Sequence, residues 1–313
     1  MESLTVDIEC RGPFNLDLSL KAMQSFGRTA AELRALPPLA GAAGASAAAG
    51  EAPTAPVFRQ GVRLAGRPMV LEVRQIQADP PVVRAEARPG PASSRVLAAM
   101  AGRVVNAGLD LVPFYGVAAA HPVFGPLIRS LYGAKPFRPS GLFEMLVTAI
   151  IEQQISLLAA HRIRERLVSR FGDEAEGEPV FPAPETLAAA SLDDLTACGL
   201  SRRKAEYTVG VAGQIVDGSL DLERLEDAPN EEVKERLVAL RGFGNWSADY
   251  VLIRGLARPD AVPVDDLAVR TIIGKWLGDG SRPSPEQTAS LLAPLAPYRG
   301  LAAFYLLVAS RLL

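Results

Sequence analysis

The chain has 313 residues, and 33 Lys and Arg against 35 Asp and Glu leave a formal net charge of −2. Hydrophobic residues make up 49% and charged residues 22%, which is typical of a globular protein and excludes a disordered or polybasic chain. The length predicts about two domains. The slightly acidic balance disfavours a nucleic-acid-binding protein without excluding one, because local basic patches and backbone amides can hold phosphates.

The composition also bears on where the protein works. Because the sequence has no long uninterrupted apolar run and starts without a basic or apolar leader, we expect neither a membrane span nor a secretory signal. Cys10 and Cys198 are the only cysteines, too few for a four-thiolate zinc or iron–sulfur site. We therefore expect a reduced, cytoplasmic monomer that contacts no membrane.

The N-terminal part of the chain has the pattern of a sheet. Residues 4–10 alternate apolar and polar side chains, as in a half-buried strand, and residues 14–26 are compatible with a short helix. Three more strand patterns, separated by Gly and Pro, follow at 57–64, 69–76 and 82–87 and predict an antiparallel sheet. Between them, residues 37–56 are rich in Ala, Gly and Pro and are expected to form a loop.

From about residue 95 the pattern becomes helical. Gly141–Phe171 is the longest expected helix, and its apolar face continues from Leu142 towards Leu167. Other helices are expected at 113–119, 122–132, 183–190, 192–197, 202–217 and 230–240. The fold class is therefore α+β. It comprises an N-terminal sheet-bearing accessory domain over 1–108 and a larger all-helical domain over 109–313.

Residues 240–248, Leu-Arg-Gly-Phe-Gly-Asn-Trp-Ser-Ala, join two expected helices by a tight turn. Asn230 is expected to cap the first helix. Gly242 and Gly244 can adopt positive φ values, and the second helix then begins with free N–H groups, which bind anions such as phosphate. The alternative is an ordinary αα-hairpin in which the glycines only make the turn.

Two adjacent carboxylates, Asp265 and Asp266, follow Pro263 and precede a helix expected to begin at Leu267. Pro263 favours an extended approach to that helix. One carboxylate suffices to cap the helix by accepting its first N–H groups. The other is then free for a chemical role.

The hairpin string resembles that of the helix-hairpin-helix DNA glycosylase superfamily. The resemblance implies that the hairpin backbone grips a DNA phosphate and that main-chain carbonyls hold a monovalent cation, Na⁺ or K⁺. No other cofactor is implied. The DNA-binding positions are Gly242, Phe243, Gly244 and Ser247, and the carbonyls are those of Val238, Leu240 and Phe243.

The same resemblance assigns a catalytic role to Asp266, twenty residues after Trp246, and leaves Asp265 as the cap. A carboxylate there would stabilise an oxocarbenium-like sugar and direct water. Trp246 stands where lyase members carry a nucleophilic Lys, which implies the alkylpurine branch of the 3-methyladenine DNA glycosylase II type and no strand cleavage. Trp246 and Tyr250 are expected to stack on the base, although Trp246 is also compatible with packing in the core.

Three further segments resemble the family. Residues 146–156 resemble the helix that leads into the DNA-probing loop, with Gln154 and Ile155 at the position that fills the gap left by the base; solvent-facing amides are the alternative. Ser201 is expected to cap the next matching helix, where Arg202–Lys204 meet a phosphate or only solvent. Residues 297–305 resemble the closing helix, but Leu307 replaces a Trp of several relatives.

The sequence therefore predicts a monofunctional DNA glycosylase that flips alkylated purines of the 3-methyladenine and 7-methylguanine type out of double-stranded DNA and hydrolyses the N-glycosidic bond. Its active-site cleft would lie between helical subdomains, and its place would be at the bacterial nucleoid. Two alternatives stay open. One is a glycosylase for hypoxanthine or uracil, and the other is a non-catalytic helix-hairpin-helix DNA-binding protein.

Overall fold

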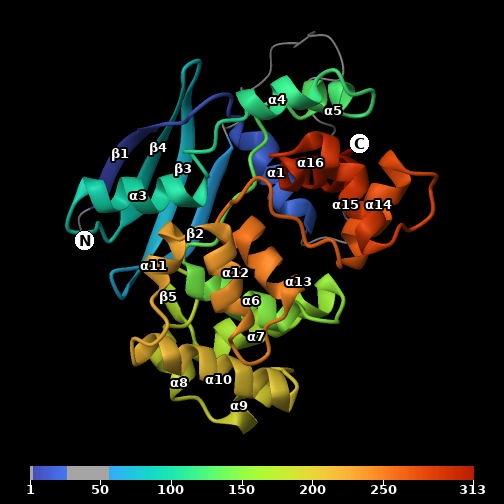
Figure 1. Cartoon of the computed structure of the whole chain (residues 1–313). Helices are drawn as coiled ribbons and strands as arrows, with labels where there is room; N and C mark the ends of the chain where they lie inside the picture. Colours follow the sequence, from blue (N-terminus) through green and yellow to red (C-terminus); the bar gives the residue numbers. More distant parts are fainter. Residues whose placement is uncertain (1–2, 27–55) are drawn as a thin grey trace.

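The structure, a computed structural model, describes residues 3–26 and 56–313. The expected Ala/Gly/Pro-rich loop at 37–56 lies outside the described residues except for Pro56. The described chain forms a sheet at one side and helices beside and below it (Figure 1).

The sheet has four antiparallel strands in the order β1-β4-β3-β2, as expected from the alternating patterns. The strands are β1 (Leu4–Glu9), β2 (Val57–Leu64), β3 (Arg67–Ala78) and β4 (Pro81–Arg88). Helix α3 (Ser94–Val104) crosses one face of the sheet, and its Leu97 and Ala101 pack with Leu71 and Val73 of β3 in one core (Figure 1). Period-two alternation predicts these strands because the sheet buries one face under the helix.

Most of the remaining chain is helical. Helix α1 (Leu16–Phe26) contacts the last helix of the chain although it precedes the second strand. The other helices are α4 (Val112–Ala118), α5 (Phe124–Ser130), α6 (Leu142–Glu152), α7 (Leu157–Phe171), α8 (Pro184–Ala188), α9 (Leu192–Ala197), α10 (Arg202–Val216), α11 (Leu222–Asp227), α12 (Asn230–Val238), α13 (Asn245–Tyr250), the π-helical turn η1 (Val251–Gly255), α14 (Leu267–Leu277), α15 (Pro285–Leu292), the 3₁₀ turn η2 (Ala293–Leu295) and α16 (Arg299–Leu312).

The expected single helix over 141–171 is wrong. The chain leaves the helix after Glu152, Gln154 takes a φ of 56°, and Ser156 caps a second helix. The apolar pattern continues across this break because α6 and α7 both bury side chains in the same core, which includes Ile151 and Leu167.

Smaller differences concern local signals. The expected cap Asn230 is the first residue of α12, and Pro229 holds the cap position. The short helix α11 and the hairpin of β5 (Asp173–Ala175) and β6 (Glu178–Val180) were not predicted. These elements are too short for the sequence to show a clear period.

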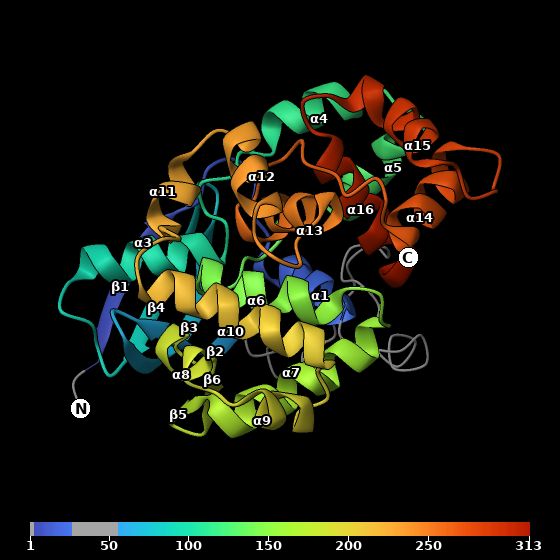
Figure 2. The ribbon, with the colours of Figure 1, turned by 60° about the horizontal axis from the view of Figure 1, so that its bottom comes forward.

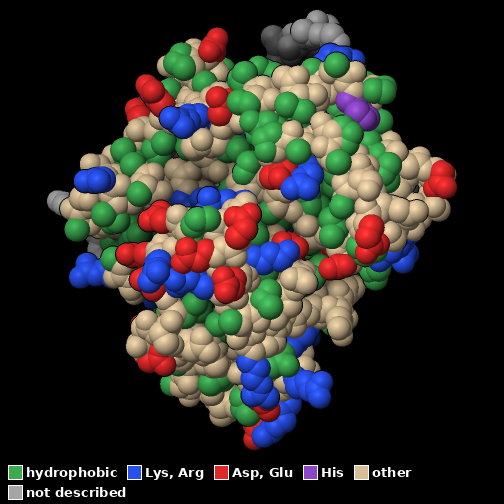
Figure 3. Space-filling model, in the orientation of Figure 1, with side chains coloured by type: hydrophobic (Ala, Val, Ile, Leu, Met, Phe, Trp, Pro, Cys, Tyr) green, Lys and Arg blue, Asp and Glu red, His purple; other side chains and the backbone are tan. Residues whose placement is uncertain are grey.

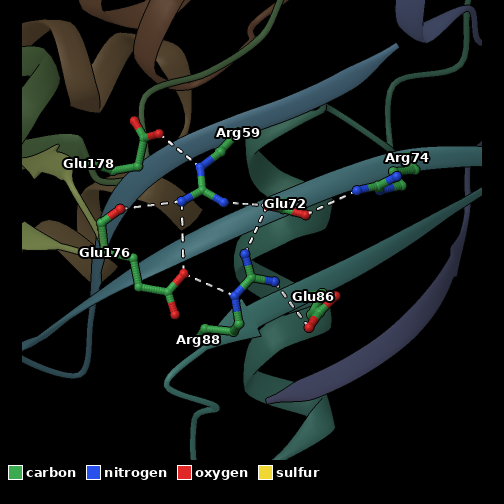
Figure 4. A network of polar contacts seen from close by, with 7 residues as sticks. All are labelled: Arg59, Glu72, Arg74, Glu86, Arg88, Glu176 and Glu178. Atoms are coloured by element: carbon green, nitrogen blue, oxygen red, sulfur yellow. Dashed lines mark hydrogen bonds and ion pairs between the residues drawn. The ribbon is translucent and has the colours of Figure 1, made fainter. Parts of the chain in front are cut away.

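The β5–β6 hairpin anchors the helical part on the sheet through an ion-pair network (Figure 4). Arg59 of β2 pairs with Glu178 at 2.8 Å, and Arg88 of β4 pairs with Glu176 at 3.0 Å. Both arginines also pair with Glu72 of β3, and this pairing lowers the pKa of Glu72 to about 2.

The domain boundary at 108/109 stays a prediction.

None of the described helices alone is long and apolar enough to cross a bilayer. The pair Pro285–Leu295 and Arg299–Leu312 meets the requirement of length and composition only together, and it is bent by 103°.

Candidate active site

A hollow of about 1060 Å³ gathers most of the predicted site residues. Its walls come from α1, the turn between α6 and α7, α13 with η1, the segment before α14, and α16. Figure 2 shows α13 with α1 and α16 near it. The predicted site residues that line it are Gly242, Gly244, Trp246, Ser247, Tyr250, Asp266, Gln154 and Ile155. Phe243 is instead buried in the core.

Asp266 is held in one orientation from two sides. Its Oδ1 accepts the N–H groups of Ala268 and Val269 at 2.8 and 3.0 Å, and its Oδ2 accepts the indole Nε1–H of Trp246 at 2.8 Å. Asp266 is therefore itself the N-cap of α14, and the expectation that Asp265 caps this helix is wrong. The chain turns at Pro263–Asp266 so that the second carboxylate faces the helix end while Asp265 is exposed.

Trp246 and Tyr250, one turn apart on α13, stack on each other with ring centroids 5.0 Å apart and an interplanar angle of 16°. A base cannot lie between rings at this distance, so the two residues do not form opposite walls of a slot. Tyr250 supports Trp246 from within the helix. Trp246 is only half-buried and lines the hollow, which favours a binding role over a core role.

The hollow also contains charged residues that the sequence reasoning missed. The Tyr250 hydroxyl donates a 2.5 Å hydrogen bond to Glu152, and the Arg254 guanidinium lies 5.6 Å from the Tyr250 ring centroid. Burial raises the pKa of Tyr250, and the adjacent Tyr250 and Glu152 raise that of Arg254. Arg254 follows Tyr250 by one helical turn, so its spacing was a usable signal.

Another wall of the hollow comes from distant parts of the chain. Phe26 at the end of α1 lies under two guanidinium groups, with Arg254 and Arg311 at 5.6 and 5.3 Å from its ring centroid. Leu307 of α16 lines the same hollow. No local signal links α1 to this site, because its contacts with α16 are made only by the folded chain.

The hairpin glycines differ in conformation. Gly242 has a φ of 92°, and a Cβ there would lie 2.2 Å from the Tyr207 ring, so this position needs glycine. Gly244 has an extended backbone with φ −124°, and the expectation of a positive φ there is wrong because Gly244 serves as the N-cap of α13. A Cβ at Gly244 would meet open space.

The N–H groups of the first turn of α13 point out of the hairpin. Ala248 is the first residue whose N–H bonds back to Gly244, so the N–H groups of Asn245, Trp246 and Ser247 have no carbonyl behind them in the helix. The Ser247 side chain is buried, and its Oγ accepts a 2.9 Å hydrogen bond from Gln153. The Ser247 hydroxyl is thus held against Gln153 and is not exposed.

The turn between α6 and α7 is fastened to the hairpin. Gln153 Nε2 also donates to the Gly242 carbonyl at 2.8 Å, and Lys204 Nζ donates to the carbonyls of Ile151 and Gln153 at 2.8 and 2.7 Å. Ser201 caps α10 as expected, and the half-buried Lys204 closes the end of α6, whereas Arg202 and Arg203 are exposed. Gln154 and Ile155, which belong to the turn between α6 and α7, are exposed.

The predicted cation site stays a prediction. The Leu240 carbonyl accepts the Phe243 N–H at 3.0 Å within the hairpin turn. Carbonyl oxygens have two lone pairs, so this bond leaves Leu240 able to accept a cation. Among the described residues, no group of three or more His, Cys, Asp or Glu could hold a metal ion, and this does not bear on a site made of carbonyls.

Comparisons with known proteins agree with this architecture. The family model of the HhH-GPD superfamily of base excision DNA repair proteins matches residues 147–297. DNA-3-methyladenine glycosylase of Bacillus subtilis is 32% identical over 63% of this chain and 66% of its own length. DNA-3-methyladenine glycosylase 1 of Schizosaccharomyces pombe is 31% identical over 54% of this chain and 73% of its own length.

A solved structure extends the similarity to the sheet. The 3-methyladenine DNA-glycosylase from Archaeoglobus fulgidus superposes with a TM-score of 0.77 and 25% identity, covering 98% of both chains. The chain spans 66% and 58% of the lengths of the two Bacillus subtilis relatives that it matches. The chain belongs to the HhH-GPD superfamily of base excision DNA repair proteins.

Proposed function

We propose that this protein is a monofunctional DNA glycosylase that excises alkylated purines from double-stranded DNA. The observation that carries the proposal is the position of Asp266, which lines the hollow beside Trp246 with its carboxylate fixed by three N–H donors. The similarity to proteins named DNA-3-methyladenine glycosylases supports this class of substrate.

The geometry suits hydrolysis at a sugar. Cleavage of the N-glycosidic bond builds positive charge on the deoxyribose, and a fixed carboxylate lowers the energy of that state without reorganising. Water attacks the sugar carbon, Asp266 accepts or directs the water proton, and the base leaves. An alkylated purine already carries positive charge, so its departure requires no strong acid.

Recognition of the base would use the free face of Trp246. A flat, electron-rich indole attracts an electron-poor, cationic purine. Tyr250 and Asp266 hold this ring from its other side and from its edge. The DNA strand would be held by the N–H groups of the hairpin, and Gln154 or Ile155 would fill the space of the flipped base.

Absence of lyase activity is part of the proposal. Strand cleavage by this superfamily needs an amine that forms a Schiff base with the opened sugar. Trp246 stands at the corresponding position, and Ser247, Ala248 and Asp249 follow it. A bacterial, nucleoid-associated, monomeric protein remains the expectation for its location and assembly.

The test is release of 3-methyladenine and 7-methylguanine from methylated duplex DNA. Wild-type protein should release both, and Asp266→Asn should lower the rate about hundredfold or more while it keeps DNA binding. Asn is a good N-cap, so the fold should persist, although its NH₂ group would then face the Trp246 N–H. Asp265→Asn removes the same charge from the adjacent, exposed carboxylate, which also lines the hollow, and should cost much less activity than Asp266→Asn.

The two alternatives separate in the same assay. A substrate series that includes hypoxanthine and uracil distinguishes a glycosylase for neutral bases, which need more help to leave. A non-catalytic DNA-binding protein would bind the duplex and release no base from any substrate. Wild-type rates in Asp266→Asn would contradict the proposed role of the carboxylate.

A further inference from the structure

One side of α7 carries a row of exposed residues that begins next to the turn between α6 and α7. Leu158, Arg162 and Arg166 follow one another at intervals of four residues, so they lie on the same side of the helix, and all three are exposed. Leu158 comes three residues after Ile155, which is exposed in the turn. The row therefore starts at the segment that is proposed to fill the space of the flipped base.

The start of α10 adds a further cation beside this row. Arg203 is exposed and lies one helical turn before Tyr207, whose ring packs against Gly242 of the hairpin. Lys204, the next residue, donates to two carbonyls at the turn between α6 and α7. The first turn of α10 is thus fastened to both segments that are proposed to contact DNA.

Arg166 borders the same end of α10. Its Nη1 would lie 3.2 Å from a Cβ at Gly199, in the loop that precedes α10, and its carbonyl accepts a 3.7 Å hydrogen bond from the Cys198 thiol. Helices α7 and α10 also bury side chains in one core, which includes Leu167 and Ala205. Figure 3 shows Lys and Arg side chains gathered at the lower end of the molecule, where α9 and α10 lie in Figure 1.

Arg162, Arg166 and Arg203 form an arginine strip, and none of the three has an ion-pair partner among the described residues. Glu165, next to Arg166 in the sequence, is exposed as well, so three cations and one anion leave a surplus of two positive charges. Three neighbouring arginines are instead paired, namely Arg170 with Asp194, Arg202 with Asp193 and Arg241 with Glu206. The strip is thus locally basic in a chain whose net charge is −2.

We propose that the arginine strip is a second contact surface for duplex DNA and binds backbone phosphates beside those held by the hairpin. This inference rests on the proposed function, because it requires a duplex that occupies the hairpin and the turn. Guanidinium groups match phosphate oxygens with paired N–H donors. Because the arginines of the strip are unpaired, no ion pair has to break when they meet a phosphate.

The dimensions of α7 agree with several phosphate contacts. Arg162 and Arg166 follow the cap Ser156 by six and ten residues, which corresponds to about 9 and 15 Å along the helix. Double-stranded DNA carries about one negative charge per 1.7 Å of its axis, so a span of this length passes several phosphates. The strip would therefore add a sequence-independent contribution to affinity and a stronger dependence on salt.

The test compares two triple variants of the full chain that remove the same total charge. One combines Arg162→Gln, Arg166→Gln and Arg203→Gln and removes the strip. The matched control combines Arg11→Gln, Arg67→Gln and Arg95→Gln, which replace exposed arginines of the N-terminal part of the chain. Thermal unfolding of both variants should match that of the wild type, because all replaced side chains are exposed.

Binding is measured by fluorescence anisotropy on a duplex that contains a stable abasic-site analogue. The strip variant should bind about tenfold more weakly or worse at about 0.1 M salt, and the slope of log affinity against log salt should become shallower by about two to three. The control variant should bind as the wild type does. Equal affinity and equal salt slopes in the two variants would overturn the proposal.

A scan of the same duplex with single neutral methylphosphonates locates the contact. Some backbone positions beside the lesion should weaken binding by the wild type when they are neutralised and should no longer do so in the strip variant. The same set of sensitive phosphates in both proteins would also overturn the proposal. Neither readout depends on base release, so a protein that binds through the strip and releases no base would contradict the proposed function alone.

Discussion

Trp246 Nε1 donates a 2.8 Å hydrogen bond to Oδ2 of Asp266, the residue that caps α14. This bond ties the helix after the hairpin to the start of α14. The aromatic ring and the carboxylate are therefore one unit, and a change in either residue should alter the position of the other.

Trp246→Phe should slow base release about tenfold or more, because it keeps an aromatic ring but removes a hydrogen bond to a charged group. Single-turnover kinetics on methylated DNA measure the effect. Trp276→Phe is the matched control, since the Nε1 of Trp276 has no acceptor among the described residues. An unchanged rate in Trp246→Phe would show that the bond does not orient the reacting carboxylate.

Gly244→Ala should weaken DNA binding without unfolding the protein. Its φ is −124° and its Cβ would enter open space, where a phosphate approaching the N–H groups of α13 would meet it. Gly242→Ala should instead destabilise the fold, by about 1 kcal/mol or more, because of its φ of 92° and the Tyr207 ring. Binding isotherms and thermal unfolding separate the two. Full affinity in Gly244→Ala would argue against phosphate binding by the hairpin.

Lys204→Met should lower both stability and base release, because it leaves the carbonyls of Ile151 and Gln153 without their donor. The expected loss is about 1–3 kcal/mol in the free energy of unfolding. Denaturant unfolding provides the measurement, with the exposed neighbour Arg203→Met as control. Equal stability of the two variants would show that Lys204 does not hold the turn.

Borohydride should trap no covalent adduct between wild-type protein and methylated DNA, whereas alkali after the reaction should cleave the strand at the abasic site. The reason is that water, and not an amine of α13, attacks the sugar. Denaturing electrophoresis detects both results. A stoichiometric adduct would identify a lysine nucleophile, and Lys204→Met and Lys275→Met would then be the first variants to examine.

The buried Lys135 should make stability rise with pH. Burial lowers its pKa from 10.5 to about 8 in the folded protein, so between these values the unfolded chain binds more protons. The unfolding free energy of the wild type relative to Lys135→Met should therefore increase from pH 8 to 10.5, by at most about 3 kcal/mol. Paired denaturant titrations measure this difference. A decrease over this range would contradict the expected protonation of the lysine.

Much of the fold could be predicted from the sequence because its periods are local. The strands at 4–9 and 81–88 alternate every second residue, and the sheet buries alternate side chains. The break at Gln154 could not be seen, since α6 and α7 bury side chains in a shared core and the apolar pattern continues across it. An apolar pattern records which side chains are buried and does not record where the backbone turns.

The sequence by itself determined which residues are candidates, because motif and spacing select Trp246 and Asp266 as a pair. Only the tertiary structure decided their geometry. Asp266 rather than Asp265 caps α14, and the Tyr250 ring stacks directly on the Trp246 ring instead of forming the opposite wall of a slot for a base. It also brought Phe26 and Arg311, from opposite ends of the chain, into one wall. The physical reason is that hydrogen-bond direction and long-range packing depend on the positions of distant elements, which no local pattern encodes.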